Sequence, residues 1–132
     1  MDSMMPSGSD DLGSYVQFFL YRVPKKNHEA MIALERKIIA GWKKHGALQS
    51  EFYHLTPHEV VRGFTSFEER ISAKEDEEIW VEVQRYRSRE QRDEIFDAIR
   101  KDMPMLELFG QWYGLVTPGE NSTMGDFRRI KI

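Results

Sequence analysis

Residues 15–46 have the sequence YVQFFLYRVPKKNHEAMIALERKIIAGWKKHG, within which a strand pattern passes into a helix pattern. The segment Tyr15–Val23 is dense in aromatic and β-branched residues, which favour a strand, and Pro24 closes it. A helix is predicted from His28 to about Lys44, because apolar side chains recur there at helical spacing. The predicted buried stripe consists of Met31, Leu34, Ile38 and Trp42, with Ile39 beside it.

Both ends of this helix carry recognisable signals. Asn27 is a predicted N-cap, because its side chain can accept a hydrogen bond from a free backbone N–H of the first turn. Lys43, Lys44 and His45 place positive charge at the negative end of the helix dipole. Gly46 follows and can adopt the left-handed conformation that commonly ends a helix.

The second half of the chain predicts a further strand, helix and strand. A strand is expected over 48–56, ended by Pro57, and an alternating strand over 79–87. Between them we expect a short, irregular strand at 60–67 and a charged turn at 72–78. Ser88 is expected to cap a helix over 89–102, with Ile95, Phe96 and Ile99 on its buried side.

Pro104 is predicted to end that helix, with one more turn at 105–109. Residues 110–125 are expected to be mostly loop, and 124–132 a last strand. The order of elements is therefore β-α-β, an irregular segment, then β-α-β. This order predicts an α+β fold of ferredoxin-like type, a βαβ-βαβ sandwich with an antiparallel sheet and its helices on one face.

Length and composition predict one domain. Residues 15–132 would form it, and residues 1–14, rich in Ser, Gly and Asp, would be a flexible leader. The chain has no cysteine, which excludes disulfides, thiolate metal sites and a cysteine nucleophile. With a net charge of −3, interleaved charges, no basic face and no long apolar run, we expect neither nucleic acid nor a membrane as partner. The cytoplasm is the expected compartment.

Each predicted strand has two different faces, because side chains alternate along a strand. We expect the aliphatic set to lie under the helices and the aromatic and polar set to lie on the open face. An open face of that kind would form a large patch, and such patches usually mark an interface or a ligand surface. The sequence therefore predicts a homodimer in which two sheets face each other. The aliphatic set is Val16, Phe18, Leu20, Leu48, Phe52, Ile79, Val81 and Val83; the other is Tyr15, Gln17, Phe19, Tyr21, Glu51, Tyr53, Trp80, Glu82, Gln84 and Tyr86.

The aromatic and polar set supplies the candidate site. Glu51 and Glu82 are the candidate catalytic residues, because a carboxylate in a partly dry aromatic pocket has a raised pKa and can act as a general base. The alternative is that they form ion pairs with Arg85, Arg22 or Lys131. The candidate ligand-binding residues beside them are Gln17, Tyr53, Trp80, Gln84 and Tyr86.

Metal and cofactor sites are not expected. His54 and His58 would share a face only on a helix, and Pro57 argues against a helix there. Dinucleotide-binding and Walker-type glycine loops are absent from the sequence, as is the nucleophile elbow of the α/β-hydrolases.

Several segments, in order, resemble the YbaA-like proteins, a bacterial family of unknown function. They are Val23-Pro24-Lys25-Lys26-Asn27, Trp42-Lys43-Lys44-His45-Gly46-Ala47-Leu48, Gly63 to Lys74, and Tyr86-Arg87-Ser88-Arg89 with Arg92-Asp93. The resemblance covers about residues 14–104 and implies a dimeric α/β-barrel fold, but it brings no catalytic residue. Because that superfamily includes several chemistries, the fold alone does not choose an activity.

Two functional hypotheses follow. In the first, the domain binds or transforms a small apolar or aromatic metabolite without a cofactor; an enzyme of this kind would carry out an unassisted oxygenation, isomerisation or lyase step. In the second, it is a non-enzymatic homodimeric binding or interaction module whose sheet face is consumed by dimerisation. The residues do not decide whether the protein is an enzyme.

Overall fold

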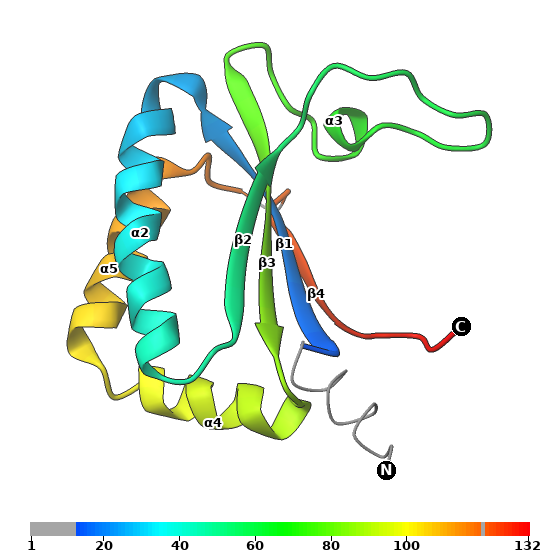
Figure 1. Cartoon of the computed structure of the whole chain (residues 1–132). Coiled ribbons are helices and arrows are strands. Elements are labelled where there is room, and N and C mark those ends of the chain that lie inside the picture. Colours follow the sequence, from blue (N-terminus) through cyan, green and yellow to red (C-terminus); the bar gives the residue numbers. More distant parts are fainter. Residues whose placement is uncertain (1–12, 120) are drawn as a thin grey trace.

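A computed structural model describes residues 13–119 and 121–132 of the chain (Figure 1). It is an α+β fold built on a four-stranded antiparallel sheet in the order β2-β3-β1-β4. The strands are β1 (Tyr15–Pro24), β2 (Gln49–His54), β3 (Glu77–Tyr86) and β4 (Thr123–Arg128). The helices are α2 (His28–Lys44), α3 (Phe67–Arg70), α4 (Arg89–Ile99) and α5 (Met103–Leu115), with a 3-10 turn, η1 (Lys25–Asn27), before α2. Of the predicted leader, residues 1–12 lie outside the described residues.

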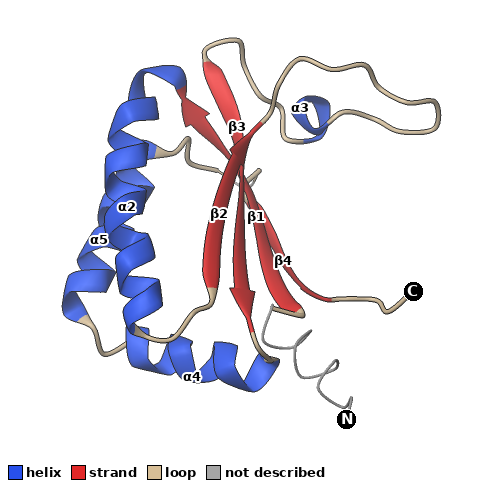
Figure 2. Cartoon of the chain, in the orientation of Figure 1, coloured by secondary structure: helices blue, strands red, loops and turns tan. Residues whose placement is uncertain are grey.

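The helices α2 and α5 lie on one side of the sheet and α4 runs across its lower end in this view, whereas α3 belongs to the long connection between β2 and β3 (Figure 2). The α2 and α5 helices pack closely against each other at Gly41. A Cβ atom on this residue would overlap the side chain of Met105, so only glycine allows the contact. The C-terminal end of α5 is tied to β1 by a hydrogen bond from the backbone N–H of Thr117 to the carbonyl oxygen of Arg22 (2.9 Å).

The strand–helix unit at the start of the chain is confirmed. The α2 helix spans Met31, Leu34, Ile38 and Trp42, all buried, and Gly46 takes a left-handed φ of 104° just after it. The role predicted for Asn27 is wrong in its mechanism. Its side chain makes no capping bond but donates to the carbonyl oxygen of Leu115 at the end of α5 (2.9 Å). Asn27 therefore joins two helices.

The irregular middle of the chain differs from the expectation. Residues 60–67 form no strand; they lie in an exposed loop that leads into the four-residue helix α3. Ser66 caps this helix by accepting a hydrogen bond from the backbone N–H of Glu69 (3.2 Å). The strand prediction failed because β-branched residues favour a strand only where a partner strand is available to pair with them.

Pro104 begins a helix instead of ending one. The α4 helix, capped by Ser88 as predicted, ends at Ile99, and α5 starts at Met103 with Asp102 as its side-chain cap. Proline is well tolerated in the first turn of a helix, where its missing N–H has no partner to lose. The loop expected over 110–125 is consequently wrong as far as Leu115.

The predicted assignment of the two sheet faces is reversed on β1 and β3. The aromatic and polar residues Gln17, Tyr21, Gln84 and Tyr86 are almost completely buried beneath the helices, whereas Phe18 is 39 % exposed on the open face. Alternation places residues in two sets but cannot say which set faces inward when both contain apolar side chains. The larger aromatic side chains fill the wide space between sheet and helices, and hydrogen bonds satisfy their polar atoms.

Candidate functional site

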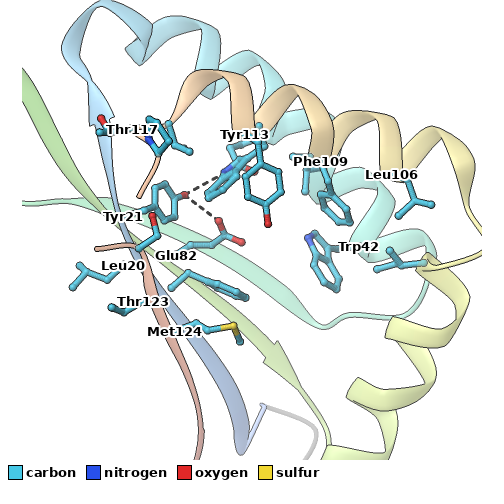
Figure 3. A pocket seen from close by; sticks show the side chains of 18 of the residues that line it. Leu20, Tyr21, Trp42, Glu82, Leu106, Phe109, Tyr113, Thr117, Thr123 and Met124 are labelled. Carbon is cyan, nitrogen blue, oxygen red and sulfur yellow. Dashed lines mark hydrogen bonds between the residues drawn. The ribbon is translucent and has the colours of Figure 1, made fainter. Parts of the chain in front are cut away.

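A cavity of about 610 Å³ lies between the sheet and the helices α2 and α5 (Figure 3). One wall is the inner face of α2, which contributes Glu35, Ile38 and Trp42. The sheet contributes Tyr21 and Glu82 to the floor. The remaining lining comes mainly from α5 and from the segments around the opening: Phe96, Ile99, Arg100, Leu106, Phe109, Trp112, Tyr113, Val116–Gly119 and Ser122–Met124, with Phe19 and Leu20 of β1.

The floor of the cavity carries a buried polar cluster. The hydroxyl of Tyr21 donates to a carboxyl oxygen of Glu82 (3.0 Å) and lies 3.4 Å from Oε2 of Glu35. The side-chain amide of Gln84 donates to the other oxygen of Glu82 (2.7 Å). Glu35 and Glu82 are only 3 % and 8 % exposed, so two carboxyl groups share one buried site.

This site favours protonated carboxyl groups. Burial raises the pKa of Glu35 to about 9, and the negative charge of Glu82 adds to the rise, against hydrogen bonds from Trp112 and Tyr21. Burial also raises the pKa of Glu82, although hydrogen bonds from Gln84 and Tyr21 oppose it. The pair therefore holds a proton at neutral pH, as two close carboxyl groups do in a medium of low polarity.

Two buried polar atoms beside the cavity have no hydrogen-bond partner: Oε1 of Glu35 and Nε1 of Trp42. Trp42 is 6 % exposed, and its indole nitrogen points into the cavity (Figure 3). Most buried polar atoms in proteins find a partner, and an orphaned one calls for an explanation. A carboxyl oxygen and an indole N–H, both without a partner, therefore lie on one face of α2.

Aromatic rings form much of the cavity wall. Trp112 packs edge-on against Tyr21, with ring centroids 4.9 Å apart. Further along, Trp42 contacts Phe96 at 5.6 Å and Phe109 at 6.2 Å. The cavity thus combines an apolar, aromatic body with a small polar end, which is the usual composition of a small-molecule site.

A second, smaller hollow of about 340 Å³ lies on the other side of α2, beside β2. His28, His54 and Trp80 line it, and His28 is hydrogen-bonded to Glu78 (2.8 Å). This bond raises the pKa of His28. Within residues 13–119 and 121–132, no group of three or more His, Cys, Asp or Glu side chains could hold a metal ion.

Of the two candidate catalytic residues, only Glu82 lines the large cavity. It is bound by Tyr21 and Gln84, so the ion pair offered as its alternative does not form. Glu51 lies on the open face and forms an ion pair with Arg85 (3.1 Å), as that alternative predicted. Tyr53 is also on the open face, with 56 % of its surface exposed.

The other predicted ligand-binding residues lie beneath the helices, and none of them lines the large cavity. The hydroxyl of Tyr86 donates to the side-chain oxygen of Gln17 (2.7 Å), whose amide donates to Asp126 (3.1 Å). The side-chain amide of Gln84 donates to Glu82, and Trp80 donates its indole N–H to Glu78 (2.8 Å). Gln17, Gln84 and Tyr86 thus take part in buried hydrogen bonds, and Trp80 lines the smaller hollow.

Glu35, Trp42 and Trp112 are among the cavity residues that the sequence-based prediction missed. Glu35 carried a usable signal, because it is a charged residue inside the apolar stripe of α2, between Leu34 and Ile38. Trp42 was assigned to the core stripe, and it is indeed buried there. Trp112 had no signal, because its segment was expected to be loop.

The chain belongs to a family of proteins of unknown function, DUF1428, whose model matches residues 14–112. The matched residues include the whole of α2, both catalytic candidates and most of α5. No curated protein is similar enough to add to this assignment. Within the described ranges, no helix is long and apolar enough to cross a membrane.

Proposed function

We propose that the cavity between α2, α5 and the sheet binds a small apolar or aromatic metabolite without a cofactor. The observation that carries the proposal is the 610 Å³ aromatic cavity ending in the buried carboxyl pair Glu35–Glu82. Its size falls within the range of small-molecule sites, and its lining is mostly apolar and aromatic, with the acid pair buried at one end. Candidate residue Glu82 keeps its role in this site, with Glu35 as its partner.

The test is a thermal-shift screen against apolar and aromatic metabolites, because a ligand that binds only the native state raises the melting temperature. A variant that fills the cavity, Leu106→Trp at its partly exposed rim, should abolish the shifts. The matched control is Ile130→Trp, which adds the same ring at a site 78 % exposed and outside the cavity. Shifts that survive in Leu106→Trp would place binding elsewhere and overturn the proposal.

We further infer a homodimer formed through the open face of the sheet, as the resemblance to YbaA-like proteins implies. The strand order and the helices between the strands support a ferredoxin-like arrangement, and two such sheets face to face make a dimeric α/β barrel. The support is an apolar patch on the open face, where Phe18 packs edge-on against Phe127 (5.1 Å) and both stay largely exposed. The patch comprises Val16, Phe18, Leu20, Tyr53, Val81 and Phe127.

The two functional hypotheses competed for one face of the sheet, but the patch and the cavity lie mainly on different faces. The cavity lies mainly on the helix-covered side, and the apolar patch lies on the other side of the sheet; of the patch residues, only Leu20 also lines the cavity. Dimerisation through the open face would therefore leave the cavity free to bind a ligand. A homodimer and a small-molecule site are compatible in this fold.

A further inference from the structure

We infer that the cavity binds an apolar amine, whose ammonium group lies against Glu35 and Glu82 and whose far end offers an acceptor to Trp42. This inference rests on the proposed ligand site and names the chemical class of the ligand. It is carried by two buried, unpartnered polar atoms on one wall of the cavity and by the absence of a counter-charge at the acid pair.

One carboxyl oxygen at the acid end of the cavity has no hydrogen-bond partner. This atom is Oε1 of Glu35, a residue that is only 3 % exposed. Among the described residues, no ion pair includes Glu35 or Glu82. An uncharged donor would satisfy the oxygen only, whereas an ammonium group would also balance the negative charge that the pair acquires when it releases its proton.

The rings around this end suit a cation. The rings of Tyr21 and Trp112 lie beside the acid pair, with their centroids 4.9 Å apart. The faces of both kinds of ring attract ammonium groups. A carboxylate-bearing ligand would be repelled by the pair, so the site discriminates by charge.

The opposite end requires an acceptor. Trp42 follows Glu35 by seven residues on α2, which is about two helical turns or ~10 Å along the axis. Its free N–H points into the cavity between them (Figure 3). A ligand that satisfies both atoms therefore has an ammonium group and an acceptor oxygen at opposite ends of an apolar body.

Proton release is a second consequence. The acid pair holds a proton near neutral pH, and an ammonium ion binds best to the ionised form. Binding should therefore release a proton, and the affinity for an amine should rise between pH 6 and pH 9. The affinity for an uncharged ligand of the same shape should not rise.

The test is calorimetric titration of the full chain with four probes of matched shape. They are 3-(4-methoxyphenyl)propylamine, the corresponding propanol, the corresponding propionate, and 3-phenylpropylamine, which lacks the acceptor oxygen. We expect the methoxy amine to bind about tenfold tighter than the alcohol, since a hydrogen bond to a charged group contributes at least that much. The propionate should bind most weakly.

Variants separate the two ends of the site. Glu35→Gln should weaken the methoxy amine about tenfold and leave the alcohol nearly unchanged, because the amide keeps the shape but not the charge. Trp42→Phe should lower the affinity for the methoxy amine to that measured for 3-phenylpropylamine. The matched control Glu51→Gln, on the open face, should change neither affinity.

The outcomes distinguish this inference from the proposed function. If the alcohol binds as tightly as the amine, or Glu35→Gln leaves amine binding intact, the amine assignment is overturned while the ligand site stands. If no probe binds and the metabolite screen also gives no shift, the proposed function itself is overturned. A rise of amine affinity with pH in the unaltered protein supports the assignment independently of any variant.

Discussion

Position 35 shows how one residue changes the character of a helix. The stripe of α2 consists of apolar residues except for Glu35, which is as deeply buried as its neighbours Leu34 and Ile38. A carboxyl group in that position must keep its proton or find a donor, because an isolated buried charge is very unfavourable. Here it meets a second acid, Glu82, and a tyrosine hydroxyl. The result is a carboxyl group whose pKa is raised to about 9 and that keeps its proton at neutral pH.

The stability of the protein should therefore fall as pH rises. The pKa of Glu35 is raised from 4.5 to about 9 by burial, so the folded chain holds a proton that the unfolded chain has lost. The stabilisation is complete below about pH 4.5 and is lost as pH rises through about 9. Thermal melts from pH 5 to pH 9 should show the melting temperature falling by about 5 °C or more.

Glu35→Gln should flatten that decline, because the amide cannot ionise. The same melts on Glu51→Gln provide the control, since Glu51 lies in an ion pair on the open face. A decline of equal slope in the Glu35→Gln protein would show that other groups cause the pH dependence. A stability that rises between pH 7 and pH 9 would contradict the raised pKa.

Among the elements, α2 and α5 depend on each other more than their sequences suggest. Close packing at Gly41 and Met105 brings the two helices together, and both line the cavity opposite the sheet. Asn27 adds a polar tie between the start of α2 and the end of α5. This hydrogen bond fixes the position of Leu115, which directly precedes Val116 and Thr117 in the cavity lining. The geometry of the site thus depends on contacts made outside it.

Asn27→Asp distinguishes this tie from ordinary capping. Aspartate is as good an N-cap as asparagine, so a capping role would make the change neutral or favourable. In the structure the side-chain amide donates to the carbonyl oxygen of Leu115, and a carboxylate cannot donate. We expect a loss of about 1–2 kcal/mol in the free energy of unfolding, measured by urea denaturation. An unchanged or higher stability would indicate that Asn27 caps α2 after all.

At the scale of the whole molecule, the sheet separates two surfaces of different composition. The helix-covered face holds the buried hydrogen-bond network and the cavity, whereas the open face carries the apolar patch around Phe18 and Phe127. Exposed apolar patches of this kind usually pack against another protein. A second copy of the chain is the partner that we propose, because a symmetric pair requires only one self-complementary surface.

Light scattering after size exclusion should give twice the chain mass of 15.6 kDa at micromolar concentration. Phe18→Glu should shift the protein to the monomer, because it places a charge in the centre of the patch. Ile130→Glu is the matched control, since Ile130 is exposed but lies after β4. A monomeric unaltered protein would contradict the homodimer and leave the cavity proposal in place.

The sequence alone was sufficient for the local elements whose causes are local. The β1–α2 unit, the cap at Ser88 and the left-handed Gly46 follow from alternation, helical periodicity and capping chemistry within a few residues. The extent of α5 was missed because proline at its start also fits a helix end. Glu82 was identified as a candidate from its aromatic neighbours in the strand pattern.

Only the tertiary structure decided which face of the sheet is buried and which residues meet at the cavity. Both faces of β1 contain apolar side chains, so the choice depends on which set fits the space beneath α2 and α5. The meeting of Glu35, Glu82 and Trp42 brings together two elements far apart in the sequence, and no local pattern specifies it. Local patterns select the conformation of each segment, whereas packing between distant segments places the side chains that form a site.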